Sequence, residues 1–69
     1  MLKLGKYQHY KGGVYEVIGV ATHSETMEEM VVYKALYDDG KLWTRPLNIF
    51  LEDVYIEGEK KPRFIYLSE

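Results

Sequence analysis

The chain has 69 residues, of which 46% are hydrophobic and 29% charged, and its formal net charge is −2. This ordinary globular composition excludes a disordered chain, and the length leaves room for one core, so we expect a single domain over residues 1–69. The absence of cysteine excludes disulfides and thiol catalysis, and no apolar run suits a signal peptide or a membrane helix, so we expect a cytoplasmic protein without a membrane partner.

Short runs of β-branched and aromatic residues, separated by glycine, predict a chain rich in strands. The first run, residues 5–10, leads into residues 11–13, where Gly12 and Gly13 suit the positive φ angles of a hairpin turn. The second run, residues 14–22, is apolar on both faces and contains Gly19. We therefore expect a central strand that bends at a bulge near this glycine.

The middle of the chain predicts a second hairpin. A third strand is expected at residues 30–37 and a fourth at residues 41–45, because Asp39-Gly40 between them is a strong hairpin signal. Before this hairpin, residues 23–29 are polar and acidic and form a connection, in which one helical turn over 24–30 is left open.

The last third of the chain begins at Pro46, which has no N–H to donate and ends the fourth strand. Residues 47–51 are expected to form a single helical turn, and residues 53–57 a fifth strand. A charged turn at 58–62 and a last strand at 63–67 complete the chain. We therefore predict an all-β fold, a small SH3-like antiparallel barrel or half-barrel of five to six strands with at most one short helical turn.

Several segments along the chain match a known group of proteins when taken together. They are residues 5–12, 15–17 with Gly19, 23–26, 31–37, 42–43, 45–47, Phe50 and 62–64. In these segments the chain resembles a family of small bacterial proteins catalogued as domain of unknown function 1653. The resemblance extends over nearly the whole chain and implies a stand-alone bacterial domain, with no catalytic residues to transfer.

Aromatic residues are abundant, with seven tyrosines and one tryptophan. Tyr33 and Tyr37 share one face of the third expected strand, and the Asp-Gly hairpin returns Trp43 and Arg45 beside that face. Two interpretations remain open at this point. The group forms a shallow binding groove, or Trp43 belongs to the core and Arg45 covers it.

The connection at residues 23–29 is expected to edge this surface, which adds His23 and Glu25 to the candidate ligand-binding residues. A solvated turn is the alternative. The two histidines of the chain match no compact metal-ligand spacing, and Ser24 beside His23 lacks the third group of a catalytic triad. We therefore predict no metal, no cofactor and no catalytic residue.

These observations favour a non-enzymatic binding module for a peptide, a partner protein or a small ligand, with the oligomeric state left open. The alternative from another class is a small enzyme or ligand-processing domain that uses His9, His23, Glu25 and Arg45. Convergence of His23, Glu25 and Arg45 in one concave site would favour the enzyme, whereas aromatic residues in an exposed groove would favour the module.

A third hypothesis is a binder of single-stranded nucleic acid. Lys3, Lys6 and Lys11 would contact the backbone, and tyrosines would stack on the bases. The net charge of −2 argues against this hypothesis, because such proteins usually carry a concentrated basic surface.

Overall fold

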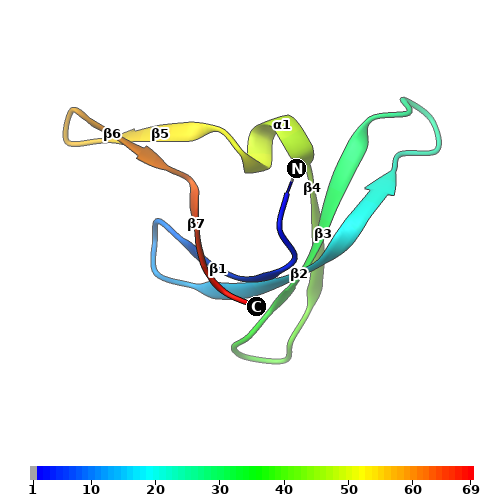
Figure 1. Ribbon diagram of the computed structural model, residues 1–69, viewed down its shortest axis with the longest axis horizontal. Helices are drawn as coiled ribbons and strands as arrows, with labels where there is room; N and C mark the ends of the chain where they lie inside the picture. Colours follow the sequence, from blue (N-terminus) through cyan, green and yellow to red (C-terminus); the bar gives the residue numbers. More distant parts are fainter. Residues whose placement is uncertain (1) are drawn as a thin grey trace.

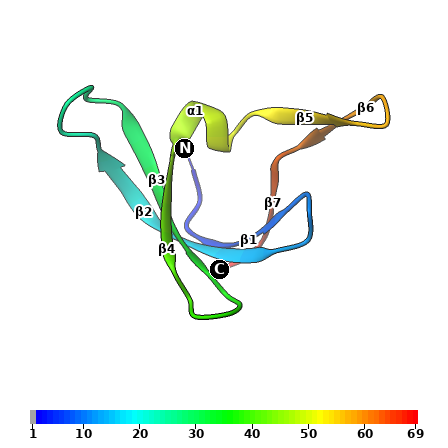
Figure 2. The ribbon, with the colours of Figure 1, turned by 180° about the vertical axis from the view of Figure 1, so that it is seen from behind.

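The fold of residues 2–69 is given by a computed structural model, in which two antiparallel sheets are connected by one short helix (Figures 1 and 2). The larger sheet has the order β4-β3-β2-β1-β7, formed by β1 (Gly5–His9), β2 (Val14–Thr22), β3 (Glu29–Ala35), β4 (Leu42–Pro46) and β7 (Phe64–Ser68). The smaller sheet pairs β5 (Asp53–Ile56) with β6 (Glu59–Pro62), and the helix is α1 (Leu47–Phe50). The all-β prediction is confirmed.

Two of the predicted hairpins are present. β1 and β2 are joined at Gly12, whose φ of 106° is accessible to glycine. β3 and β4 are joined by residues 36–41, in which Asp38 and Gly40 have φ angles of 51° and 67°. This loop is longer than the predicted turn because β3 ends at Ala35, two residues earlier than expected.

The predicted bend in β2 is confirmed. The pairing of β2 with β3 shifts register between Val17 and Gly19, so Ile18 is the extra residue of a bulge. The bulge lies next to the buried Val17, and the hairpin of β2 and β3 continues past it as a long arm (Figure 1).

The larger sheet is open within residues 2–69, because β4 and β7 lie at its two edges and do not pair with each other. A closed SH3-like barrel is therefore not confirmed. The described residues form seven strands rather than five or six, since β6 occupies most of the segment expected to be a turn. The turn itself is confined to Glu57 and Gly58, whose φ angles of 51° and 82° suit a tight two-residue hairpin.

The connection between β2 and β3 contains turns but no helix, so the helical turn left open there does not form. Its backbone reverses at Met27, which has a φ of 64°. The polar side chains of this segment instead bond locally, as Thr26 Oγ1 donates to Glu28 Oε1 at 3.0 Å.

The core lies on the inner face of the larger sheet and is mostly aromatic. Its buried members are Tyr7, Val17, Val31, Tyr33, Phe50 and Phe64. The predicted helical turn at residues 47–51 is confirmed as α1, and it places Phe50, only 2% exposed, into this core. The Phe50 ring stacks on Phe64 with centroids 4.1 Å apart, which fixes the start of β7 against α1.

Among residues 2–69, the single helix is a four-residue turn, far too short to cross a bilayer.

Candidate functional site

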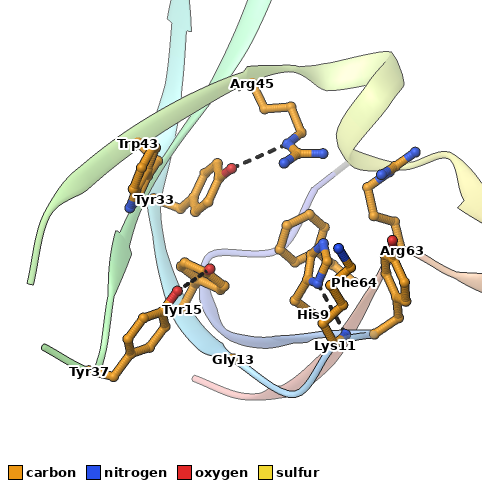
Figure 3. A pocket seen from close by; sticks show the side chains of 11 residues that line it. His9, Lys11, Gly13, Tyr15, Tyr33, Tyr37, Trp43, Arg45, Arg63 and Phe64 are labelled. Atoms are coloured by element: carbon orange, nitrogen blue, oxygen red, sulfur yellow. Dashed lines mark hydrogen bonds between the residues drawn. The ribbon is translucent and has the colours of Figure 1, made fainter.

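A pocket of about 620 Å³ opens where the β1–β2 turn, the β3–β4 hairpin and the start of β7 meet (Figure 3). We call it the aromatic pocket. Most of its lining side chains are aromatic or cationic; the lining consists of His9, Tyr10, Lys11, Gly13, Tyr15, Tyr33, Tyr37, Trp43, Arg45, Arg63 and Phe64. Its volume is within the range of about 300–1,000 Å³ that is usual for small-molecule sites.

One wall of the aromatic pocket comes from the β3–β4 hairpin. Tyr33 and Trp43 are directly opposite each other on neighbouring strands, so their side chains share a face. Tyr33 is 4% exposed and belongs to the core, whereas Trp43 is 50% exposed because β4 is an edge strand. The interpretation of Trp43 as a core residue is therefore wrong, and its ring is available to a ligand.

The cationic side chains are Lys11, Arg45 and Arg63, and they include both arginines of the sequence. Figure 3 shows Arg63 and Lys11 on the side of the pocket opposite Trp43. Arg63 Nη2 donates to Glu52 at 3.1 Å, which partly compensates its charge. No aspartate or glutamate lines the aromatic pocket within the part of the chain that the structure describes. The pocket is therefore electropositive although the whole chain is acidic.

His9 adds a neutral hydrogen-bond donor to this surface. Burial lowers the pKa of His9 from its usual value, and the charges of Arg45, Arg63 and Lys11 lower it further. The Nδ1 atom of His9 accepts a hydrogen bond from the Lys11 backbone N–H at 3.1 Å. An accepting nitrogen carries no proton, so neutral His9 has its hydrogen on Nε2.

Two tyrosine hydroxyls meet beside the aromatic wall, where Tyr15 and Tyr37 are hydrogen-bonded to each other (Figure 3). This hydrogen bond raises the pKa of Tyr15 to about 12, with burial as the second cause. The two groups hold two hydroxyl hydrogens and use one between them, so one donor remains for a ligand. Gly13 makes room for the pair, because a Cβ there would lie 3.1 Å from Tyr37 Cε1 and 3.3 Å from Tyr15 Cε1.

The structure brings four of the six predicted site residues together. Tyr33, Tyr37, Trp43 and Arg45 all line the aromatic pocket. Arg45 Nε donates to the Tyr33 hydroxyl at 3.2 Å, and its guanidinium carbon is 5.7 Å from the centre of the Phe64 ring. The period-2 placement of Trp43 and Arg45 on one face of the fourth strand is thus confirmed.

His23 and Glu25 lie apart from the aromatic pocket, in the connection between β2 and β3. The Nδ1 atom of His23 accepts hydrogen bonds from the backbone N–H groups of Glu25 and Thr26, so the imidazole stabilises its own loop. The structure does not bring His23, Glu25 and Arg45 together, and no cluster of three His, Cys, Asp or Glu side chains suitable for a metal occurs in residues 2–69.

Sequence reasoning missed the pocket side chains of Tyr10, Tyr15, Arg63 and Phe64, and it considered His9 and Lys11 only for other sites. Tyr15 pairs with Ala35 across β2 and β3, so the register of these strands is the signal that would have found it. Lys3 and Lys6, the other members of the expected basic patch, do not line the pocket.

Comparison with known proteins gives a family but no activity. The family model described as "Protein of unknown function (DUF1653)" matches residues 5–66. A crystal structure of a DUF1653 protein from Bordetella bronchiseptica is 40% identical, with a TM-score of 0.88, and the alignment covers 96% of this chain and 87% of that one. No curated protein matches the chain. From the family match and this structural similarity, the chain belongs to the DUF1653 family.

Proposed function

We propose that this chain is a non-enzymatic binding module whose aromatic pocket recognises a ligand with a negatively charged group and a flat apolar part. One observation carries the proposal. Both arginines of the sequence and Lys11 line a pocket with exposed aromatic rings and no carboxylate in the lining of the described residues. Such a surface attracts anions and offers ring faces for stacking.

The positive charge of the aromatic pocket favours a negatively charged ligand. Burial is the main cause of the lowered pKa of His9, and the positive charges of Arg45, Arg63 and Lys11 lower it further. A cationic ligand would be repelled there, whereas an anion gains charge-assisted hydrogen bonds from the guanidinium groups.

The arrangement favours binding over catalysis. His23 and Glu25, the partners of Arg45 in the enzyme hypothesis, lie in a different loop. Within the pocket, the Nδ1 atom of His9 is occupied by the Lys11 backbone, and the raised pKa of Tyr15 keeps its hydroxyl protonated and weakly nucleophilic.

The test is a titration of the folded chain with four small aromatic probes, namely benzoate, phenyl phosphate, benzyl alcohol and benzylamine. Binding is followed by ¹H–¹⁵N chemical shifts and by the fluorescence of Trp43, the sole tryptophan of the sequence. We expect the two anions to change the amide chemical shifts of pocket residues in a saturable, salt-sensitive manner, and benzylamine to have no effect.

Two variants assign the binding to the pocket. Arg45→Gln should weaken anion binding about tenfold, because it removes a charge-assisted hydrogen bond. Lys61→Gln removes an exposed charge outside the pocket and should leave binding unchanged. Equal affinity for benzoate and benzylamine, or equal effects of the two substitutions, would contradict the proposal.

A further inference from the structure

We infer that the ligand of the aromatic pocket is a nucleoside monophosphate, either as a free nucleotide or as the phosphorylated end of a single strand. This inference rests on the proposed function and names the ligand class for the same site. Three features of the lining carry it: the amount of positive charge, the exposure of the rings, and the polar groups beside them.

The charge of the pocket matches one phosphate group. Lys11 and Arg45 each contribute one positive charge, while the charge of Arg63 is partly compensated by its ion pair with Glu52. A phosphate monoester carries a charge of about −1.5 to −2 at neutral pH and has three acceptor oxygens. It would therefore neutralise most of the charge of the lining, whereas a single carboxylate, such as the end of a peptide, would leave at least about one positive charge uncompensated.

The exposed rings lie where a base could stack. Trp43 and Tyr37 are 50% and 43% exposed, although both line the same pocket. Figure 3 shows Trp43 and Tyr37 on the wall across the pocket from Arg63, so a ring and a phosphate can be held at the same time. Stacking of a base on an aromatic side chain accepts any base, because every base has a flat π-face.

Polar groups beside the rings suit the edge of a base. The Tyr15–Tyr37 hydroxyl pair has one free donor hydrogen and unused lone pairs, and neutral His9 offers its Nε2–H. A purely apolar aryl group would leave these groups without partners on binding, which costs affinity. The donors and acceptors of a nucleobase can satisfy them.

The experiment compares AMP with its parts, using isothermal titration calorimetry and Trp43 fluorescence on the full chain. The parts are adenosine, ribose 5-phosphate and inorganic phosphate. We expect AMP to bind at least about tenfold more tightly than any of the parts and to quench Trp43, because the base stacks only when the phosphate is anchored.

Three variants check the mode of binding. Trp43→Leu should lower the affinity for AMP about tenfold while leaving the affinity for inorganic phosphate nearly unchanged. Lys11→Gln should lower the affinity for both AMP and inorganic phosphate about threefold. Lys61→Gln is the matched lysine control, and it should change neither affinity, since Lys61 lies on β6 outside the pocket.

Two oligonucleotides distinguish the sources of the nucleotide. Hexaadenylate with a 5′-phosphate should bind at least as tightly as AMP if the pocket takes the end of a strand, and more weakly than AMP if it takes a free nucleotide. Hexaadenylate without that phosphate should lose most of the affinity in either case. Equal binding of the two oligonucleotides, at an affinity no weaker than that of AMP, would overturn the inference.

Other results separate this inference from the proposed function. If AMP binds no better than phosphate while phenyl phosphate or benzoate occupies the pocket, the nucleotide assignment is wrong and the proposed function stands. The assignment is also wrong if a peptide with a free C-terminal carboxylate binds more tightly than AMP. If no anion perturbs the pocket, both fail.

Discussion

Arg45 is tied to the core by one hydrogen bond, from its Nε to the hydroxyl of the buried Tyr33 at 3.2 Å. Replacing Arg45 by alanine should therefore lower the free energy of unfolding by about 1–2 kcal/mol, through the lost hydrogen bond and the lost packing of the side-chain stem. Urea melts of Arg45→Ala measure this loss. Lys61→Ala, an exposed control, should change stability by less than about 0.5 kcal/mol.

A double-mutant cycle with Tyr33→Phe checks the origin of that loss. If the hydrogen bond is the main term, the two substitutions together should cost clearly less than the sum of their separate effects. Additive losses would mean that Arg45 stabilises the fold by another route.

Gly40 is expected to be the sensitive position of the β3–β4 hairpin. Its φ of 67° lies in the left-handed region, where a β-branched residue clashes with its own backbone. Gly40→Val should therefore reduce the free energy of unfolding by roughly 1 kcal/mol or more. Gly19→Ala is the control, because nothing lies within 4 Å of a Cβ at Gly19, and its urea midpoint should remain near that of the parent chain. Equal midpoints for both variants would contradict the role of Gly40.

The ionisation of His9 should make stability depend on pH. Its pKa is lowered in the folded chain, so the unfolded chain binds more protons between the folded pKa and about 6.5. The contribution of neutral His9 to the free energy of unfolding is then fully present above about pH 6.5, and it is lost as the pH falls through the pKa of His9 in the folded chain. Proton NMR should give a His9 midpoint below 6.5, and His9→Gln should flatten the unfolding free energy in this window. A midpoint at or above 6.5 would contradict the burial and positive potential around His9.

The hydrogen bond between the Tyr15 and Tyr37 hydroxyls leads to a prediction that NMR can test. Tyr15 has a pKa of about 12, chiefly because its hydroxyl is hydrogen-bonded to Tyr37. Tyr37→Phe should lower the pKa of Tyr15 toward the ordinary value near 10. Carbon NMR of tyrosine labelled at Cζ can follow Tyr15 during an alkaline titration. An unchanged midpoint in Tyr37→Phe would show that burial, and not the hydrogen bond, controls this group.

The sequence predicted the local parts of the fold well because local rules determine them. Gly12 and Gly40 mark the hairpins by their backbone freedom, and Gly19 marks the bulge. The strand at Glu59–Pro62 was missed because its Lys-Lys-Pro composition is typical of a turn. It forms because the two positive-φ residues before it make a tight hairpin with β5.

The candidate site was likewise predicted where local patterns determine it and missed where a long-range strand pairing does. Trp43 and Arg45 follow from the period of two along a strand, and Tyr33 follows from the hairpin that pairs it with Trp43. Arg63 and Phe64 could not be found this way, because β7 reaches the pocket by pairing with β1 at the other end of the chain. No local pattern encodes such a long-range pairing.

That pairing of β1 with β7, with Tyr7 opposite Tyr66, also determines when the pocket exists. Strands β1 to β4 follow one another as neighbours, whereas bringing β7 onto β1 costs the loop entropy of nearly the whole chain. Arg63 and Phe64 join the pocket through this contact of large sequence separation. A chain that lacks β7 therefore displays Trp43 without Arg63 and Phe64, so ligand binding at the proposed site would report completed folding.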